Sequence, residues 1–398
     1  MTHIILLQGS KDIAKEFIAD KNNVHLHLFD DGLKYRDFYT WQLDLQPFVI
    51  HRTYSLLDYQ KQQFTPLEVR MEIGIPMVIY CEDDTPEQLE SKYLRSAKLW
   101  GYKISLINLD PDDTSWKSVK WLDQVIDAKD ITTSNFWSFF EEPVVNCNKY
   151  SNLYVVGDLQ GCKPHLDSFI DSHSLDDSLV VFLGDLTDRG PDNVGTLLTL
   201  VELKKTLGDR MIVLYGNHDF YSKQYFLGRK TGSNTFDETF AEYEAYGFSE
   251  AQIADINAFY SNLRWYQKAI FSDANFVFTH GGISYVPNCM AQYPGIQYVR
   301  GNKTFGNLDE LRGKSYYQEI DQVDEMFSNW SECQDTTHYS FHGHRNPNNS
   351  YFSKNGLAYN LESGVDKLGG FLSVVKISRY EDLKNGDRLV FKNLPINI

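Results

Sequence analysis

Residues 184–190 read GDLTDRG and directly follow the apolar run Leu179–Leu183. A short apolar run bounded by Gly predicts a buried β-strand that ends in a tight turn. The turn would place the carboxylates of Asp185 and Asp188 just beyond the carboxyl end of that strand. Ligands of α/β sheets bind in the crevice outside such ends. The stretch therefore predicts an α/β fold with a polar site at a strand end.

The same arrangement recurs at four other places after residue 150. The runs that we interpret as buried strands are Leu153–Val156, Met211–Tyr215, Phe276–Thr279 and His338–Phe341. The segments that follow them are Gly157-Asp158-Leu159-Gln160-Gly161, Gly216-Asn217-His218-Asp219, His280-Gly281-Gly282 and Gly343-His344. Together these segments offer carboxylates, an amide carbonyl and imidazoles. This mixed oxygen and nitrogen set suits Mn²⁺, Fe or Zn²⁺ better than the all-oxygen shell of Ca²⁺.

The composition excludes several classes of protein. The 398 residues include no run approaching the roughly 18 apolar residues that a membrane span needs. Five scattered cysteines without a C-x-x-C pair exclude a cysteine zinc site and a disulfide framework, and they favour a cytoplasmic location. The net charge of −16 repels nucleic acid in bulk. A local site where bound cations reverse the sign is still compatible with this charge.

The chain divides by pattern into two predicted domains, 1–145 and 150–398. In the first, the runs Ile4–Leu7, Met77–Tyr80 and Ile104–Leu109 predict strands, and residues 86–100 predict a helix that begins after Thr85. Strand, helix and strand make a βαβ unit and imply a parallel sheet. Residues 141–149 are predicted to form a linker, and residues 236–263 are predicted to be helical.

The five motifs resemble those of the calcineurin-type metallophosphoesterases, in the branch of phosphoprotein phosphatases and symmetrical diadenosine tetraphosphatases. The family pattern, GDxHG, GDxxDRG, GNH[DE], HGG and GH, covers roughly residues 150–365. One such motif occurs by chance in turns, but five in this order, each after a predicted strand, make a specific signal. The resemblance implies an α+β domain, a two-sheet β-sandwich flanked by helices, and hydrolysis of phosphoesters with two divalent metal ions.

The resemblance also implies a role for each matching residue. Asp158 and Asp185 would hold the first metal, with Asp185 bridging to a second metal held by Asn217, His280 and His344. His218 would be the general acid that protonates the leaving oxygen, oriented by Asp188. Arg189 would grip the phosphate, which suits a guanidinium group. The nucleophile would be a hydroxide that bridges the two metals.

One position departs from the pattern, because Gln160 stands where the family usually has His. An amide oxygen is a weaker and harder ligand than imidazole. Gln160 is therefore expected either to ligate the first metal less tightly or to contact a metal-bound water. Since some diadenosine tetraphosphatase-like members read GDLQG, the departure does not imply a dead site.

Each candidate also has a structural interpretation. Asp158, Asp185 and Asn217-His218 alone would be read as turn or cap residues. His280 could be a satisfied histidine at a strand end, and Arg189 could form a surface ion pair. His342 is an alternative to His344 as the metal ligand, and strand alternation would put both side chains on the same side of the sheet. The residues expected to have ordinary packing or polar roles are His165, His173, His338 and Cys162.

Residues 1–145 resemble, more faintly, a P-loop kinase of the polynucleotide-kinase type. Ile4–Leu7 followed by Gln8-Gly9-Ser10-Lys11 lies where a strand would lead into a phosphate loop, but the G-x-x-x-x-G-K-[ST] pattern is absent. This indicates a degenerate, pseudokinase-like domain without kinase activity. It would bind a protein partner or nucleic acid, or support the second domain.

The substrate prediction combines the two resemblances. Residues 359–365 and 369–372 are similar to the closing strands of phosphatase modules in polynucleotide kinase-phosphatases. The first hypothesis is therefore a 2′- or 3′-phosphate, or 2′,3′-cyclic phosphate, at a polynucleotide end. A dinucleoside polyphosphate is the second and a phosphoprotein the third. A non-catalytic nucleotide- or partner-binding protein is the alternative of another class, but such a protein has no need for Asp188, Arg189, Asn217 and His218 together.

Overall fold

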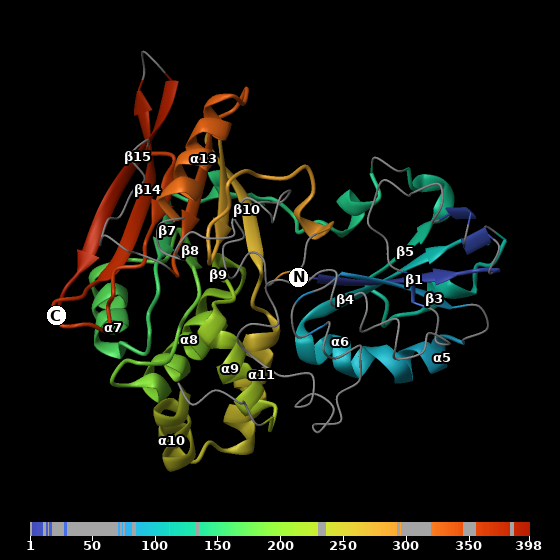
Figure 1. Ribbon diagram of the computed structural model, residues 1–398, viewed down its shortest axis with the longest axis horizontal. Helices are drawn as coiled ribbons and strands as arrows, with labels where there is room; N and C mark the ends of the chain where they lie inside the picture. The colour runs from blue at the N-terminus through green and yellow to red at the C-terminus, as the bar shows by residue number, and fades with distance from the viewer. Residues whose placement is uncertain are drawn as a thin grey trace. The chain divides into compact units, whose positions relative to one another are not determined.

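The computed structural model describes residues 2–10, 13–14, 16–17, 28–29, 71, 74, 76–81, 85–110, 112–132, 135–229, 236–292, 295, 320–344, 356–382 and 386–398. The chain forms two compact units. Unit 1 comprises Met1–Glu141 with Asn288–Gly295, and unit 2 comprises Glu142–Pro287 with Ile296–Ile398 (Figure 1). None of the described helices is both long and apolar enough to span a membrane.

Unit 1 is built on a parallel sheet whose described strands lie in the order β2-β3-β1-β4-β5. The strands are β1 (Thr2–Gln8), β2 (Leu28–Phe29), β3 (Met77–Cys81), β4 (Tyr102–Asn108) and β5 (Gln124–Asp127). The three strands predicted from the apolar runs are confirmed, and so is the parallel sheet. The two strands of the predicted βαβ unit, β3 and β4, are not neighbours in the sheet, however. Strand β1 lies between them and pairs with both.

The predicted helix of unit 1 forms as a continuous segment with one wide turn in its middle. It consists of α5 (Pro86–Leu89), the π-helical turn η1 (Glu90–Leu94) and α6 (Arg95–Trp100). Thr85 caps its start through a capping box with Gln88, and Gly101 ends it in the left-handed conformation (φ 73°). The buried face that holds it on the sheet consists of Leu89, Tyr93, Ala97 and Trp100.

The loop after β1 has a structural explanation. A Cβ atom on Gly9 would lie 2.7 Å from the Cβ of Leu109, and the N–H of Leu109 donates to the carbonyl of Gln8 at 2.9 Å. Gly9 therefore permits close packing between the ends of β1 and β4. Lys11, the other residue of interest in this loop, lies outside the described residues. The short 3₁₀ helices of the unit are η2 (Ser115–Ser118), η3 (Ala128–Asp130), η4 (Trp137–Phe140) and η8 (Met290–Gln292).

Unit 2 contains two sheets. Sheet I has the described order β15-β14-β7-β8-β9, in which β7, β8 and β9 are parallel and β14 and β15 form an antiparallel hairpin beside them. Its strands are β7 (Asn152–Val156), β8 (Ser178–Phe182), β9 (Met211–Val213), β14 (Leu372–Asp382) and β15 (Gly386–Ile396). Three of these strands were predicted, whereas the long β14–β15 hairpin was foreseen only at its start.

Sheet II has the described order β13-β12-β11-β10-β6, and β11, β12 and β13 are parallel. Its strands are β6 (Val145–Asn146), β10 (Tyr266–Phe271), β11 (Ala274–Thr279), β12 (His338–His342) and β13 (Ala358–Asn360). The prediction of a linker at 141–149 is wrong for its second half. There β6 pairs with β10, the 3₁₀ helix η5 (Cys147–Lys149) follows, and Cys147 is fully buried.

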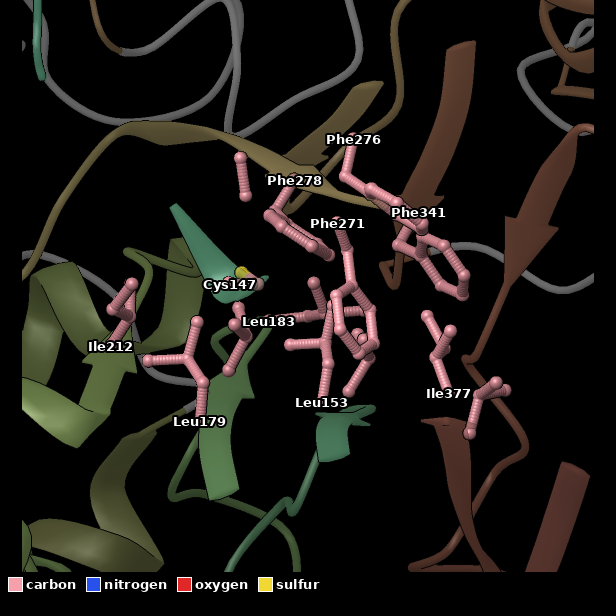
Figure 2. Close-up of a cluster of buried hydrophobic side chains, with 14 of the residues drawn as sticks. Cys147, Leu153, Leu179, Leu183, Ile212, Phe271, Phe276, Phe278, Phe341 and Ile377 are labelled. Carbon is pink, nitrogen blue, oxygen red and sulfur yellow. The ribbon is translucent and has the colours of Figure 1, made fainter. Parts of the chain in front are cut away.

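The core of unit 2 lies between the inner faces of the two sheets. Figure 2 shows Phe271, Phe276, Phe278 and Phe341 of sheet II facing the aliphatic side chains of sheet I. The labelled aliphatic side chains opposite them are Leu153, Leu179, Ile212 and Ile377. Burial of these inward-facing side chains holds the two sheets together face to face. The architecture is the predicted two-sheet sandwich with mixed sheets.

Helices cover the outside of this sandwich. They are α7 (Lys163–Ser172), α8 (Asn193–Leu207), α9 (Asn217–Phe226), α10 (Asp237–Tyr246), α11 (Glu250–Ser261) and α13 (Ile320–Glu332), with the 3₁₀ turn η6 (Gly208–Arg210). The helical prediction for 236–263 is confirmed as two helices separated at Gly247. Both α10 and α11 pack against α8, and α11 also packs against α9, while α13 packs against β12 and β13 (Figure 1).

Candidate metal centre and acid site

The five predicted motifs meet at one edge of unit 2. Parallel strands end at the same edge of a sheet, so β7, β8 and β9 deliver Asp158, Asp185 and Asn217 to one edge of sheet I. In the same way β11 and β12 deliver His280 and His344 to an edge of sheet II. Bonds from His280 to Leu183 and from His344 to Asp158 cross between the sheets, so the two edges face each other.

Asp185 is the centre of this group. Its Oδ1 lies 3.3 Å from His280 Nε2 and accepts the backbone N–H of His218 at 2.9 Å. Its Oδ2 accepts from Gln160 Nε2 at 3.3 Å. The ligand atoms of Asp185, His280 and His344 lie within 4.8 Å of one another, which makes this trio a candidate metal site. Burial alone would raise the pKa of Asp185, but the His218, His280 and His344 imidazoles hold the pKa below its ordinary value.

His280 is oriented like a metal-binding imidazole. Its Nδ1 lies 2.9 Å from the carbonyl oxygen of Leu183, which can only accept, so Nδ1 carries the proton. The other nitrogen, Nε2, lies 3.3 Å from both Asp185 Oδ1 and Asn217 Oδ1. One imidazole nitrogen and two side-chain oxygens thus converge on one point, and such a donor set suits a divalent cation.

Asp158 joins the two sheets. Its carboxylate accepts the backbone N–H of His344 at 3.1 Å, and the ring of His344 lies 5.0 Å from that of His280. A Cβ atom on Gly343 would lie 1.8 Å from Asp158 Oδ1, so only glycine leaves room for the carboxylate. Asp158 also shares a hydrogen bond with Glu362. Burial, and then the charge of Glu362, raise the pKa of Asp158 well above its ordinary value.

Gln160 lies inside the group, as its place in the motif predicts. The side chain is buried, and its Oε1 has no hydrogen-bond partner, although Nε2 reaches Asp185. A buried carbonyl oxygen without a donor is costly. A cation or a water molecule near Gln160 would satisfy this oxygen, so its position is compatible with a cation bound beside Asp185.

The predicted general acid, His218, lies beside the candidate metal-binding side chains around Asp185, which we call the metal group. His218 Nδ1 donates to Asp188 Oδ2 at 2.8 Å, and Arg189 Nη2 donates to His218 Nε2 at 3.1 Å. His218 Nε2 is 3.7 Å from Asp185 Oδ2. Burial would lower the pKa of His218, but the Asp185 charge and the bond to Asp188 outweigh burial and raise it. The three residues predicted for acid catalysis and phosphate binding are thus in contact.

Strained backbone is concentrated in this site. Among the described residues other than glycine, positive φ angles occur at Gln160 (47°), Asp185 (50°), Asp188 (90°), Arg189 (67°) and His344 (69°), and elsewhere only at Ser272. Each such conformation costs about 1–3 kcal/mol and persists only where surrounding contacts enforce it. The site loops therefore need strong anchors.

Asp219 supplies one of these anchors. Its Oδ2 accepts the N–H groups of Asp185 and Gly216, both at 2.8 Å, and its Oδ1 accepts the N–H of Leu186 at 3.0 Å. Its side chain is fully buried. Burial, and then the neighbouring Asp185 carboxylate, raise the pKa of Asp219 to about 6. One carboxylate thus holds the loop after β8 against the loop after β9.

His342 and His344, the two histidines at the end of β12, point to different places. His342 Nε2 bonds to Asp324 Oδ1 of α13 at 2.9 Å, whereas His344 lies at the metal group. The expectation that strand alternation puts both on one side is wrong. The strand ends at His342, and the left-handed backbone of His344 redirects its side chain.

The other residues given packing or polar interpretations lie outside the metal group. His173 and His338 bond to the carbonyl oxygens of Phe169 and Thr336. His165 is half-buried. Cys162 is buried, and burial raises the pKa of its thiol to about 11, so it is not a reactive thiolate. Cys147, Cys162 and Cys333 are free thiols.

Three residues of the site were not singled out from the sequence. Asp219 was visible as the last residue of Gly216-Asn217-His218-Asp219 but received no role. Glu362 was quoted only as part of a closing segment. Thr239, which donates to Asp188 Oδ1 at 2.6 Å, lies in a helix and carries no sequence signal at all.

The family model for the calcineurin-like phosphoesterases matches residues 151–370, just over half of the chain. The chain belongs to the calcineurin-like phosphoesterase family. This family uses divalent metal ions, and the trio of Asp185, His280 and His344 is a candidate site for them.

Similar proteins include two symmetrical bis(5′-nucleosyl)-tetraphosphatases. The protein from Nitrosomonas europaea is 37% identical over 70 residues, which are 17% of this chain and 25% of that protein. The protein from Ralstonia nicotianae is 32% identical over 132 residues, 33% of this chain and 41% of that protein. The chain thus matches well under half the length of either relative. A protein serine/threonine phosphatase structure from Saccharomyces cerevisiae matches 63% of this chain and 83% of that chain, with 15% identity and a TM-score of 0.41.

Proposed function

We propose that this phosphoesterase cleaves its substrate with two divalent cations and with His218 as the general acid. Asp158, Gln160 and Asp185 would hold the first cation. Asp185 would bridge to a second cation held by Asn217, His280 and His344. The observation that carries the proposal is the contact between the two groups: His218, bonded to Asp188 and Arg189, lies 3.7 Å from the central Asp185.

The residues present fit such cations. Asp185 Oδ1 and Asn217 Oδ1 both lie 3.3 Å from His280 Nε2, and the buried Oε1 of Gln160 has no donor. The donors are oxygen and nitrogen atoms, which suits Mn²⁺, with Fe or Zn²⁺ as alternatives. Bound divalent cations would supply a water nucleophile of lowered pKa and would neutralise charge on the phosphoryl group.

In this proposal, the contact between Arg189 and His218 links substrate binding to proton transfer. A guanidinium can only donate, so while Arg189 bonds to His218 Nε2, that nitrogen holds no proton. A phosphate oxygen is a stronger acceptor for Arg189 than an imidazole. Binding of the substrate phosphate would draw Arg189 away and free Nε2 to take up a proton from solvent, which it then gives to the leaving oxygen. Asp188, bonded to Nδ1, would stabilise the imidazolium in this step.

Gln160→His is expected to strengthen cation binding at the first position. The backbone of Gln160 is left-handed, a conformation in which His is enriched, and imidazole is a better ligand than an amide for Mn²⁺, Fe or Zn²⁺. The affinity for the first cation should rise on the order of tenfold, measured by calorimetric titration of the metal-depleted protein. Gln160→Leu, which keeps the volume and removes the oxygen, should weaken it. If both variants bind like the wild type, Gln160 does not contact the cation.

For the substrate, we propose a dinucleoside polyphosphate cleaved within its phosphate chain. The two relatives described above carry the name symmetrical bis(5′-nucleosyl)-tetraphosphatase, and their matches support this class. The net charge of −16 disfavours a long nucleic-acid footprint.

A polynucleotide end carrying a 2′- or 3′-phosphate, or a 2′,3′-cyclic phosphate, is the second candidate. The parallel sheet of unit 1, with β1 central and leading into Gly9, favours it, because it agrees with the resemblance to a degenerate polynucleotide-kinase-type domain. Unit 1 would then bind a partner or nucleic acid, or support unit 2. Five scattered cysteines without a C-x-x-C pair support a cytoplasmic location.

The test is a substrate panel with the purified full chain, supplied in turn with Mn²⁺, Fe²⁺ and Zn²⁺. The panel contains diadenosine tetraphosphate, RNA oligonucleotides with 3′-phosphate or 2′,3′-cyclic ends, and a phosphoserine peptide. Preferred hydrolysis of diadenosine tetraphosphate supports the first substrate class, and preferred hydrolysis of the RNA ends replaces it with the second. Absence of metal-dependent hydrolysis of every substrate would overturn the proposed mechanism.

A further inference from the structure

Helix α10 presents one face to the proposed acid. Phe236, which precedes the helix, and Thr239, Glu242 and Tyr243 follow helical spacing, so they lie on the same side of α10. Phe236, Thr239 and Tyr243 are buried. Phe236 lies against the ring of His218, and Thr239 bonds to Asp188. Glu242 bonds to the main chain of Val194, and Tyr243 bonds to Ser222. All four residues lie more than forty residues from Asp188 in sequence.

Thr239 makes the most direct contact. Its hydroxyl donates to Asp188 Oδ1 at 2.6 Å, while the other oxygen, Oδ2, accepts from His218 at 2.8 Å. Each carboxylate oxygen of Asp188 thus has its own side-chain donor. The hydroxyl fixes the plane of the carboxylate and thereby the direction from which His218 is held.

A second contact runs through the backbone of the acid loop. Asn193 Oδ1 accepts the N–H of Asp188 at 2.6 Å, and Asn193 Nδ2 donates to Glu242 Oε2 at 2.8 Å. Glu242 Oε1 accepts the N–H of Val194 at 2.8 Å. The strained backbone at Asp188 (φ 90°) is therefore tied to α10 through Asn193.

The remaining contacts complete the face. The ring of Phe236 lies 5.2 Å from that of His218. The hydroxyl of Tyr243 lies 3.3 Å from Ser222 Oγ, which in turn lies 2.9 Å from Thr187 Oγ1, in the residue before Asp188. Both the imidazole and the loop that carries its partner thus rest on α10.

From this geometry we infer that Thr239 is a positioning residue for the general acid, acting through Asp188, and that α10 is the element that delivers it. The inference rests on the proposed role of His218. Thr239 touches neither the metal group nor the predicted phosphate-binding residue, so its effect should be confined to proton transfer to the leaving oxygen. Losing one hydrogen bond of this kind corresponds to a change of about two- to tenfold.

Thr239→Val, which keeps the shape and removes the hydroxyl, tests this with two esters of different leaving-group demand. An alkyl phosphate needs the acid, whereas p-nitrophenyl phosphate has a leaving group that departs without a proton. With metal-loaded full chain, Thr239→Val should lower kcat for the alkyl phosphate by about two- to tenfold and leave p-nitrophenyl phosphate nearly unchanged. Thr239→Ser should restore the alkyl rate.

The matched control is Thr196→Val, because Thr196 is equally buried but donates to the carbonyl of Asp192. Thr196→Val should change kcat for the two esters by the same factor. An equal loss for both esters in Thr239→Val, or no rescue by Thr239→Ser, would overturn the inference and leave Thr239 a packing residue.

A proton NMR measurement separates this inference from the proposed function. The His218 Nδ1 proton, assigned by its loss in His218→Asn, should move downfield in Thr239→Val, because Asp188 then has one donor fewer and accepts more strongly. Thr239→Ser should keep the wild-type position. An unmoved resonance would overturn the inference even in an active enzyme. Should the wild type hydrolyse neither these esters nor any substrate of the panel described for the proposed function, that function fails, and this resonance still decides the role of Thr239.

Discussion

His218→Asn should slow hydrolysis of an unactivated phosphoester by about 10²–10⁴-fold, the usual contribution of a general acid. Asparagine retains a polar side chain but cannot deliver a proton at neutral pH. The contact of His218 with Asp185 that involves its main chain, N–H to Oδ1 at 2.9 Å, survives the substitution. Metal content, measured by elemental analysis of the loaded protein, should therefore stay close to that of the wild type.

The loss should depend on the leaving group. An ester of p-nitrophenol should lose much less than an alkyl ester, because its leaving group needs no proton. His173→Asn is the matched control, since His173 bonds to the carbonyl of Phe169 in α7 and should be exchangeable without loss of rate. A His218→Asn protein with unchanged kcat would show that another group is the acid. A protein that has lost its metal would show that His218 supports the metal group instead.

Much of this site could be predicted because parallel strands impose a common edge. Asp158, Asp185 and Asn217 each follow a strand that is recognisable from its apolar run, and such strands end together. The same argument places His280 beside His344. Local sequence is sufficient to bring these residues to a common edge, since that depends on where each strand ends.

The contacts that lock the site could not be predicted in the same way. Thr239 and Glu242 look like ordinary helix residues, and only the packing of α10 against α8 brings them to Asp188 and Asn193. The separation of His342 from His344 depends on one left-handed residue, which a β-strand pattern does not reveal.

The sheets show the same limit. Strand periodicity identified β3 and β4 but gave no sign that β1 lies between them, because pairing partners depend on the whole sheet. The segment at 145–146 has too few residues for a periodic signal, yet it pairs with β10 as an edge strand. Pairing over more than 120 residues is a property of tertiary structure, and Pro143 just before it favoured the linker interpretation.

Asp219→Asn is expected to have the second large effect, this time on both stability and rate. The carboxylate of Asp219 accepts three backbone N–H groups, from Asp185, Leu186 and Gly216. An amide has one acceptor oxygen, so at least one buried N–H would face an NH₂ group and lose its partner. Such a loss costs about 1–3 kcal/mol, which chemical denaturation of the metal-free protein would measure as a lower free energy of unfolding.

The rate should fall as well, because the lost bonds are those that hold Asp185 in its strained conformation (φ 50°). A displacement of about 1 Å in a reacting group can cost about 10²-fold, and a loss of this order is expected in kcat for activated and unactivated esters alike. This lack of dependence on the leaving group distinguishes Asp219 from His218, whose loss should be selective. Asp219 acts on the metal group, through Asp185, and not on the proton.

Asp113→Asn is the matched control. Asp113 also accepts a backbone N–H, from Ser115 at 2.9 Å, but it lies in unit 1. Its exchange should leave kcat unchanged. If Asp219→Asn folds with wild-type stability and keeps the wild-type rate, the three bonds do not set the geometry of Asp185. The strain at that residue would then have to be held by His280, Gln160 and His218, whose side chains also contact its carboxylate.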